Sequence, residues 1–477
     1  MEGILSWLGI VYENTLFIYG LVLLLVYALL ALLSMLAIRY YTRKDTQHQL
    51  DILASSPMAP GLTILAPAFN EGLTIISNVR SLLTLNYPRY EIIIINDGST
   101  DNTMEQLIAE FNMVAVDFAY NARILTQPVR KIYKSTNPAY SSLLVIDKVN
   151  GKSKADAVNA GINIATFKYF VCTDVDCILH KDTLLELALP VMQEQKNRVI
   201  AVGATLRIAN SSEFDEGVLI RMRPPRQLLP RFQEVEYIRS FVLGKMGWSY
   251  INCVPNVSGG LGLFDKEVAT WCGGYDHSSF GEDMELLTRM CRYAHDNQIN
   301  YAVRYIPKTL CWTEGPSSVK IFSRQRTRWA RGLAQLMYAH FSMFMNPRYG
   351  KMGLIVFPFN FFFELLAPLI EFSGILIYIY LGVTGQVNWP YALLLLLFVY
   401  TYAVMITTIS ILWDQLSFGY YKKWWEVAYL CLTPFMEFLL YHPLIVFFSL
   451  RGYYYFLTGK KSTWGNMQRQ GFGKKKK

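Results

Sequence analysis

The sequence predicts an α/β protein with a doubly wound parallel sheet, held between apolar segments that are long enough to cross a membrane. Two observations predict the sheet: short apolar runs alternate with helix-compatible segments, and polar residues follow the ends of the runs. A third observation predicts the membrane segments. Of the 477 residues, 52% are hydrophobic and only 17% are charged, which is too apolar for a wholly soluble protein of this size.

An uncharged stretch at residues 15–38 is the first predicted membrane segment. As a helix it is long enough to span the hydrocarbon core, and it is longer than the apolar core of a secretory signal. Three basic residues follow it directly, namely Arg39, Arg43 and Lys44. The positive-inside rule therefore places the N-terminus outside and the next part of the chain in the cytosol, with 1–44 as the anchor and its basic flank.

Four apolar runs carry the predicted sheet, at 62–69, 91–97, 169–176 and 199–208. Helix-compatible segments separate them, and this alternation is typical of parallel strands whose crossover helices cover both faces. Ligands of such sheets bind at the carboxyl ends of the strands. The polar residues that close the runs are therefore of interest: Asn70, Glu71, Asp97, Asp174 and Asp176.

Three motifs carry carboxylates, and each also has an ordinary structural interpretation. NDGSTDNT at 96–103 could be a turn with a helix cap. TDVDC at 173–177 has two acids that would point to opposite sides of a strand, one toward a nucleotide and the other toward a divalent metal on its phosphates. GED at 281–283 could be a charge pair that the helix dipole favours, or Asp283 could be a general base for an attacking hydroxyl.

Other patterns exclude some functions. NGKSKADAVNAG at 150–161 is not a phosphate-binding loop, because position 146 is Ile where a glycine is required. SGGLG at 258–262 lacks dinucleotide spacing and predicts a tight loop of close approach. The seven cysteines show no zinc spacing. The net charge of +9 includes a basic tail at 458–477, and beside a membrane segment such a tail favours anionic lipid over nucleic acid.

A basic and aromatic cluster, SRQRTRWARG at 323–332, stands where the polar block ends. It could be a positive-inside anchor or part of an amphipathic helix on anionic lipid. We expect interface helices over 318–350 and transmembrane helices over 351–457. The apolar stretches in the latter run over 352–383, 389–413 and 424–457.

Glu364 and Glu371 lie seven residues apart within an apolar stretch, hence on one helical face. A lipid-facing charge costs about 2 kcal/mol or more, so we expect this face to line a polar interior. The alternative is an interface helix over 352–370 with Glu364 among headgroups. Three simple crossings would put the basic tail outside, so we expect that one of two proline-containing segments, 352–383 or 424–457, does not cross simply.

Taken in order, the motifs resemble those of the inverting family-2 glycosyltransferases. The resemblance is to the membrane-embedded group that includes cellulose, hyaluronan, chitin and poly-N-acetylglucosamine synthases, and it runs from about residue 60 to 345. It implies a GT-A fold for 45–317, a UDP-sugar donor and a divalent Mg or Mn cofactor. Three departures stand out: GED replaces TED, no module for a cyclic dinucleotide is recognisable, and 210–232 has no assigned chemistry.

The resemblance implies a role for each matching residue. On the donor side, Phe69 and Glu71 in APAFNE would receive uracil and ribose, Asp97 belongs to the DGS motif, and Lys154 would meet the diphosphate. The DxD element consists of a nucleotide-binding residue and a metal ligand, Asp174 and Asp176 respectively.

On the acceptor side, Asp283 of GED would be the catalytic base, and QxxRW would consist of Gln325, Arg328 and Trp329. Trp329 would stack on the acceptor sugar, and Arg328, joined by Arg326, would stabilise the departing diphosphate. Direct displacement without a covalent intermediate would convert an α-linked donor into a β-linked product.

The implied function is processive synthesis and export of a β-linked polysaccharide at a bacterial inner membrane, with the catalytic domain in the cytosol. The implied partners are the UDP-sugar, a growing polysaccharide or lipid acceptor, the bilayer and accessory export proteins, without nucleic acid. Two alternatives stay open: non-processive transfer of one sugar to a lipid carrier, and a catalytically silent membrane scaffold or channel subunit.

Overall fold

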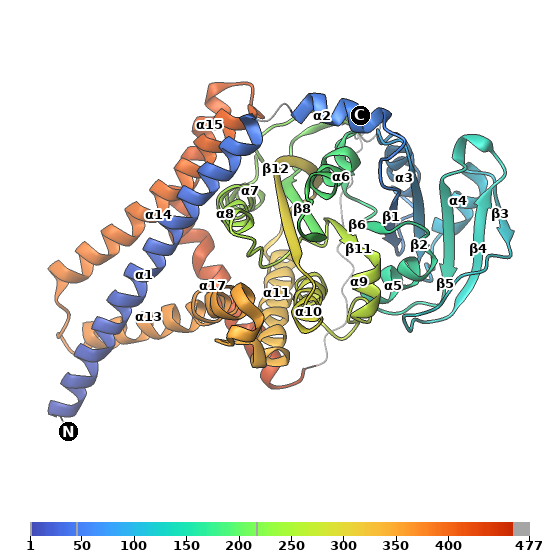
Figure 1. The fold of residues 1–477 in the computed structure, drawn as a ribbon. Helices are drawn as coiled ribbons and strands as arrows, with labels where there is room; N and C mark the ends of the chain where they lie inside the picture. The colour runs from blue at the N-terminus through green and yellow to red at the C-terminus, as the bar shows by residue number, and fades with distance from the viewer. Residues whose placement is uncertain (1, 44–45, 216–217, 461–477) are drawn as a thin grey trace.

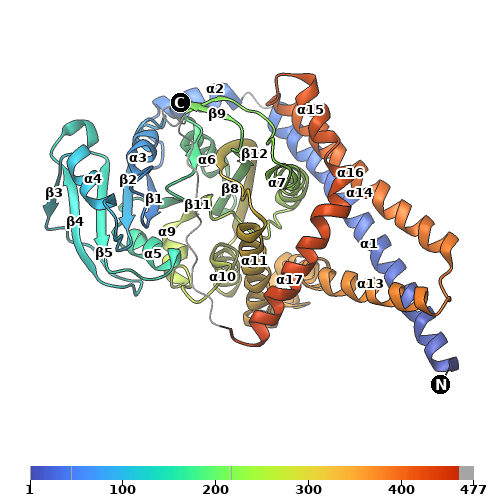
Figure 2. The same cartoon turned by 180° about the vertical axis from the view of Figure 1, so that it is seen from behind.

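The computed structural model describes residues 2–43, 46–215 and 218–460 (Figure 1). Lys44 and most of the expected basic tail, from 461 onward, lie outside the described residues. The described chain forms a sheet domain beside a group of long helices, one from the N-terminal end and the others from the C-terminal part (Figures 1 and 2).

A ten-stranded sheet forms the centre of the sheet domain. Its order is β3 (Met113–Val116), β4 (Val129–Ser135), β5 (Leu143–Lys148), β2 (Tyr90–Asn96), β1 (Leu62–Ala68), β6 (Tyr169–Thr173), β11 (Leu261–Asp265), β8 (Arg198–Ile208), β12 (Tyr301–Thr313) and β7 (Ile178–Leu179). The four predicted runs form β2, β1, β6 and β8, so the α/β prediction is confirmed. The parallel pairs β1–β2 and β1–β6 are direct, whereas β11 lies antiparallel between β6 and β8.

Two details of the sheet differ from the sequence prediction. The sheet is mixed rather than wholly parallel, because β11 pairs antiparallel with both of its neighbours and the strands at both edges, β3–β4–β5 and β12–β7, are antiparallel too. The second half of SGGLG belongs to this strand and not to a loop, since Leu261 and Gly262 pair with Thr173 and Cys172. Only 258–260 form the expected close-approach loop.

Helices connect these strands, and several of them position the candidate site. They are α2 (Thr46–Ser55), α3 (Ile75–Leu83), α4 (Thr103–Glu110), α5 (Lys154–Ile164), α6 (Thr183–Gln193), α9 (Lys266–Trp271) and α10 (Glu282–Asp296). A further helical stretch runs through α7 (Leu228–Ile238), a π-helical segment (Arg239–Lys245) and α8 (Met246–Tyr250). The segment at 210–232 is thus not only a loop, because it contains a small hairpin of β9 (Glu213–Asp215) and β10 (Val218–Arg221) and the start of α7.

Four helical segments are long and apolar enough to cross a membrane: Asn14–Arg43, Met352–Val383, Trp389–Phe418 and Trp424–Leu457. We call them the membrane-length helices. The first lies in α1 (Glu2–Arg43) and the third is α14 (Trp389–Phe418), and these two run side by side (Figures 1 and 2). The Tyr402 hydroxyl donates to the Leu24 carbonyl across this pair at 2.6 Å.

Helix α14 continues beyond residue 413, where the expected apolar stretch ends. Asp414 interrupts the apolar sequence, but its carboxylate is buried against the guanidinium of Arg207 from β8. The Arg207 guanidinium also donates to Glu234 of α7 at 2.7 Å. A charge that is paired in this way does not need to leave the packed interior, so the helix runs on to a left-handed cap at Gly419.

Both proline-containing segments are broken, whereas the sequence analysis expected this of one. Met352–Val383 contains two π-helical turns, Met352–Val356 and Asn360–Leu365, before α13 (Ala367–Val383). Trp424–Leu457 is divided into α15 (Trp424–Cys431), a short helix with a π-helical turn (Pro434–Tyr441) and α17 (His442–Leu457). Proline has no N–H to donate, which accounts for breaks beside Pro368, Pro434 and Pro443.

Helix α11 (Val319–Ala339) contains the basic and aromatic cluster and packs along α17 (Figure 2). The approach is close, because a Cβ added at Gly452 of α17 would lie 2.6 Å from the Thr327 carbonyl oxygen. On its other side, a Cβ added at Gly332 would lie 2.7 Å from the backbone nitrogen of Gly281. The two glycines therefore allow the cluster to pack closely against a membrane-length helix on one side and the GED motif on the other.

Candidate active site

A cavity of about 3710 Å³ extends from the carboxyl ends of the strands to the space between the membrane-length helices. We call its two parts the sheet end and the helix end. Ten residues for which the sequence analysis proposed a role at the donor or the acceptor line it: Phe69, Glu71, Asp97, Lys154, Asp174, Asp176, Asp283, Gln325, Arg328 and Trp329. The structure thus brings together motifs that are up to 260 residues apart in the chain.

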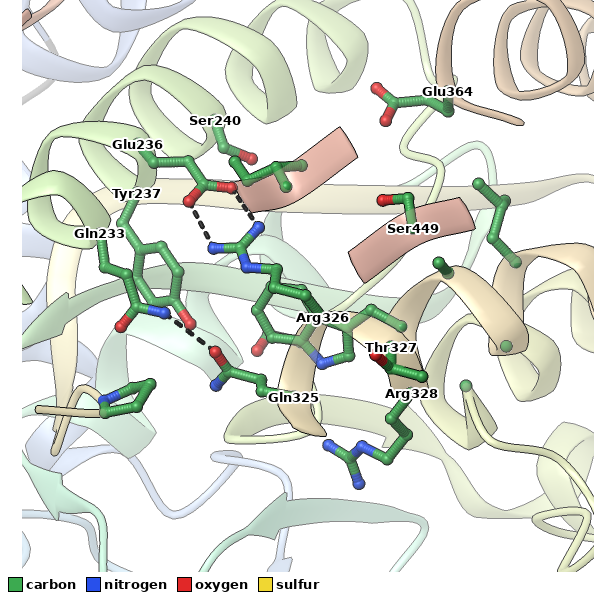
Figure 3. Close-up of a pocket in the computed structure, with 18 of the residues that line it drawn as sticks. Gln233, Glu236, Tyr237, Ser240, Gln325, Arg326, Thr327, Arg328, Glu364 and Ser449 are labelled. Carbon is green, nitrogen blue, oxygen red and sulfur yellow. Dashed lines mark hydrogen bonds and ion pairs between the residues drawn. The ribbon is translucent and has the colours of Figure 1, made fainter. Parts of the chain in front are cut away.

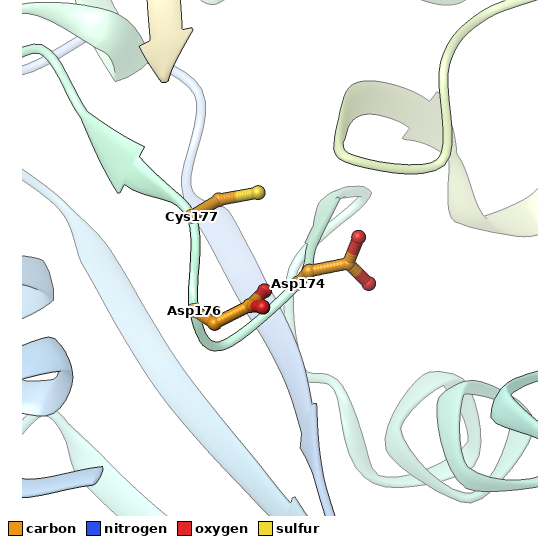
Figure 4. Close-up of side chains that lie close together, drawn as sticks. All are labelled: Asp174, Asp176 and Cys177. Atoms are coloured by element: carbon orange, nitrogen blue, oxygen red, sulfur yellow. The ribbon is translucent and has the colours of Figure 1, made fainter. Parts of the chain in front are cut away.

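The DxD carboxylates converge (Figure 4). The sequence analysis placed Asp174 and Asp176 on a strand with opposite orientations, and this is wrong because β6 ends at Thr173. A turn follows, in which the Cys177 amide donates to the Asp174 carbonyl at 3.0 Å. Ligand atoms of Asp174, Asp176 and Cys177 consequently lie within 4.8 Å of one another.

The chemistry of this group fits a hard divalent cation. Two carboxylates supply the oxygen ligands that Mg²⁺ and Mn²⁺ prefer. The third group, Cys177, is a poor ligand as it stands, because a hydrogen bond with Cys311 and burial raise the pKa of its thiol well above the ordinary value. The carboxylates are therefore the residues that could hold the ion.

Lys154 places a positive charge beside the DxD turn. It is the first residue of α5, whose start is capped by the Ser153 hydroxyl. Its Nζ lies 2.5 Å from Asp174 Oδ1 and donates to the Gly259 carbonyl at 2.8 Å. Burial acts to lower the pKa of Lys154, but Asp174 and the other acidic neighbours together raise it, so the group stays charged. A lysine at a helix N-terminus suits a phosphate group.

Asp97 is held by a buried lysine that the sequence analysis missed. Lys148 of β5 is fully buried, and its Nζ donates to Asp97 Oδ1 at 2.7 Å and to Asp156 Oδ2 at 2.5 Å. The Gly151 amide also donates to Asp97 Oδ1, at 3.0 Å. Nothing in VIDKVNGK distinguishes Lys148 from a surface lysine, because Asp97 is 51 residues away and Asp156 lies in the helix that follows.

The loop after β1 is joined to the NDGSTDNT motif. The amide of Asn70 donates to the Ser99 hydroxyl at 3.0 Å, and the amide of Glu71 donates to the Thr103 hydroxyl at 2.9 Å. Phe69 precedes this junction and is 38% exposed, so its ring is accessible from the cavity that it lines. An accessible aromatic face at a strand end is suited to stacking with a planar base.

Asp283 is oriented by two backbone amides. Gly259 donates to its Oδ2 and Met284 donates to its Oδ1, both at 2.9 Å. Gly259 thus joins Asp283 to Lys154, because its carbonyl accepts from the lysine. The neighbouring Glu282 is buried, and burial raises the pKa of its carboxyl. The two acids of GED therefore have different environments.

QxxRW lies on α11, and its Gln325 and Arg328 side chains point in different directions (Figure 3). Gln325 Oε1 accepts from Gln233 Nε2 at 2.9 Å. Trp329 is 37% exposed, and the Arg326 guanidinium lies 4.6 Å from its ring centre. The Arg328 charge lowers the pKa of Glu282, although burial of that carboxyl has the larger, opposite effect.

Arg326 does not join Arg328 toward the sheet end, as the sequence analysis expected. It is buried, and its guanidinium binds both oxygens of Glu236, at 2.6 and 2.5 Å. It also donates to the Tyr441 hydroxyl at 2.8 Å. Figure 3 shows Arg326 directed toward Glu236 and Arg328 directed away from it. Arg326 therefore fixes α11 on α7.

Lys245 is a second lysine that the sequence analysis missed. It lines the cavity between the two ends, is only 7% exposed, and its Nζ lies 4.6 Å from the ring centre of Phe241. Burial lowers the pKa of Lys245 to about 8, and the Asp283 charge opposes this shift. The sequence contains no signal for it, because the segment before SGGLG is a helix without a motif.

Two family models match the chain. Residues 63–246 match the model described as glycosyl transferase family 2, and residues 229–442 match the one described as glycosyl transferase family group 2. Together they cover the sheet domain, the QxxRW helix and most of the membrane-length segments.

Curated relatives of the chain include poly-beta-1,6-N-acetyl-D-glucosamine synthases. One from Staphylococcus epidermidis is 26% identical over 308 residues, which are 64% of this chain and 63% of the relative. One from Staphylococcus aureus (strain COL) is 26% identical over 320 residues, which are 67% of this chain and 64% of the relative. The chain therefore spans less than two thirds of the length of these relatives.

Among solved structures, a mannosyltransferase from Pyrobaculum calidifontis in complex with GDP-mannose and Mn²⁺ is similar to this chain with a TM-score of 0.48. It is 17% identical, and the match covers 91% of this chain and 99% of that one.

Proposed function

Taking residues 63–442 as those of a membrane-type family-2 glycosyltransferase, we propose that the protein is an inverting, processive enzyme. It transfers a sugar from a UDP-sugar to the end of a growing β-linked polysaccharide and passes the product across the membrane. The observation that supports this most is the cavity, which joins the DxD turn, the GED motif and QxxRW to the space between the membrane-length helices.

On the donor side, Phe69 stacks on the uracil, while Glu71, Asp97 and Asp174 orient the nucleotide. Lys154 binds the diphosphate as a fixed ammonium group, and Arg328 supplies a second cation. Asp176 would hold a Mg or Mn ion, which would supply positive charge beside the diphosphate. These cations stabilise UDP as the leaving group.

On the acceptor side, Asp283 takes the proton of the acceptor hydroxyl as its oxygen forms a bond to the anomeric carbon. The bond from that carbon to the diphosphate oxygen breaks, and UDP leaves with the electron pair. Gly259 and Met284 fix the Asp283 carboxylate for this task. Trp329 carries the acceptor sugar on its ring, and Gln325 supports this part of α11 through Gln233.

We propose UDP-N-acetylglucosamine as the first donor to test, because the relatives named above are synthases of an N-acetylglucosamine polymer. The proposed location is a bacterial inner membrane with the domain at 45–317 in the cytosol, the interface helices at 318–350 and the C-terminal crossings at 351–457. The bilayer and accessory export proteins complete the set of partners.

The test uses the purified protein in lipid nanodiscs with a panel of UDP-sugars and with Mg²⁺ or Mn²⁺. We expect UDP release with one donor, together with a polymer that is resolved by chromatography. A single sugar on a lipid carrier would favour the non-processive alternative. Donor binding without any UDP release across the panel would favour a silent scaffold or channel subunit.

A further inference from the structure

Three carboxylates of the chain between 352 and 457 line the helix end of the cavity, and two of them have a basic side chain as partner. Glu437 accepts from Arg239 at 2.7 and 3.0 Å. Glu371 lies 2.7 Å from the Nε2 atom of His442. These two pairs link neighbouring helices, so their charges are already used by the protein itself.

Glu364 is the third carboxylate, and it differs from the other two. Within the part of the chain that the structure describes, it has neither a hydrogen bond nor an ion pair, and its side chain is exposed. Figure 3 shows it beside the cavity, across from Glu236 and Ser449. The Arg326 guanidinium is paired with both oxygens of Glu236, so its charge is already balanced by a carboxylate other than Glu364.

Three tyrosines line the same cavity as Glu364, namely Tyr19 and Tyr27 of α1 and Tyr453 of α17. The Tyr19 hydroxyl donates to the carbonyl of Phe362 at 2.9 Å, which ties α1 to the π-helical turn that carries Glu364. Aromatic faces suit the C–H faces of sugar rings, and a carboxylate accepts hydrogen bonds from hydroxyl and amide groups.

We propose that Glu364 and these tyrosines form a saccharide-binding subsite at the helix end, which accepts neutral or amino-bearing glycans and rejects glycans that contain uronate. The proposal rests on the proposed function in one respect, namely that the glycan product passes through this part of the cavity. Beyond the proposed function, the subsite specifies the class of polymer that the protein accepts and names Glu364 as the residue that selects it.

The selectivity follows from charge in a cavity that lies between apolar helices. An N-acetyl or hydroxyl group donates a hydrogen bond to Glu364, and an ammonium group pairs with it. A uronate brings a second negative charge next to a carboxylate that has no compensating cation, and such repulsion is stronger between low-dielectric walls than in water. We expect at least a tenfold difference in Kd between neutral and uronate-containing glycans.

The experiment measures binding of three hexasaccharides to the full chain in nanodiscs by calorimetry. One is a neutral N-acetylglucosamine oligomer, the second is its de-N-acetylated form, and the third alternates glucuronate with N-acetylglucosamine. The wild-type protein should bind the first two and bind the third at least tenfold more weakly. Glu364→Gln should remove most of this difference, whereas Glu364→Asp should keep it.

A matched control is Glu105→Gln on α4, which removes an exposed charge outside the cavity and should leave all three Kd values unchanged. The proposal is overturned if wild-type protein binds none of the oligomers, if it binds all three alike, or if Glu364→Gln retains the discrimination. Because binding needs neither donor nor metal, it stands apart from the catalytic proposal. UDP release by the wild-type protein, measured on the same preparation, reports that proposal separately.

Discussion

At the sheet end of the cavity, functional groups belong to motifs that the sequence shows, whereas at the helix end the paired groups belong to no motif. Lys154 and Asp174 are separated by 20 residues, and both belong to recognisable motifs. Arg239 and Glu437 are separated by 198 residues, and neither belongs to one. Functional residues at the end of a strand can therefore be predicted from local sequence patterns. The residues that line a cavity between helices cannot, because their positions depend on how the helices pack.

The largest effect should come from Asp283→Asn, which removes the proposed proton acceptor at the sheet end. Asparagine offers one carbonyl oxygen to the two amides that Asp283 satisfies, so the side chain also loses an anchor. We expect sugar transfer to fall by about a hundredfold or more, with UDP binding unchanged within a few-fold. The measurement is steady-state UDP release beside UDP calorimetry.

The neighbouring substitution Glu282→Gln is the control for Asp283→Asn, because Glu282 is the buried acid of the same motif. It should have a much smaller effect on turnover. Equal losses of turnover in the two variants would show that sugar transfer depends on the negative charge of the motif and not on a base at Asp283.

Trp329→Ala tests whether the residue at the junction of the two ends binds the acceptor sugar. If Trp329 carries the acceptor, its loss removes a flat surface for the sugar ring, and a displacement of the acceptor by about 1 Å can cost on the order of a hundredfold in rate. We expect polymer yield to fall accordingly, while UDP binding persists. Trp329→Phe should recover part of the activity. Normal elongation with weaker membrane retention would support the anchor interpretation of the cluster.

Much of the fold was predictable, because β1, β2, β6 and β8 are apolar runs that local patterns identify. Strand β11 was missed, since it follows a glycine-rich loop directly and is too short to show a pattern. The buried, paired Lys148 and Arg207 could not be predicted from the sequence either. Arg207 resembles the end of a strand at a surface, and only the folded chain shows that Asp414, which is 207 residues away, is its partner.

Arg207→Met tests whether the long-range pairs hold the two regions together. The Arg207 side chain is buried with Glu234 and Asp414, and removal of one partner leaves buried charge uncompensated. The expected cost is about 3–5 kcal/mol in the free energy of unfolding, measured by thermal unfolding in nanodiscs. Arg292→Met on α10 is the control, because its ion pair with Asp296 is partly exposed and within one helix. Equal stability of the two variants would contradict a structural role for the network.

Lys245→Met should have the smallest effect on stability. Unlike Arg207→Met, it should raise the free energy of unfolding. Lys245 lies between the two ends, and burial lowers the pKa of its ammonium group from 10.5 to about 8. The charged form is therefore less stable in the folded protein than in the unfolded chain. Below about pH 8 this penalty is fully present, and it declines as pH rises toward 10.5, because the folded protein loses the proton first.

Methionine keeps the apolar contacts of the Lys245 stem without the charge, so the variant should be more stable than the wild type at pH 7 by on the order of 1–3 kcal/mol. This gain should shrink when unfolding is measured at pH 9.5, where wild-type Lys245 is largely neutral in the folded state. Lys245→Arg stays charged at both pH values, so its stability relative to Lys245→Met should not show that change. A gain for Lys245→Met that is independent of pH would mean that packing, rather than the buried charge, sets the stability at the junction of the two ends.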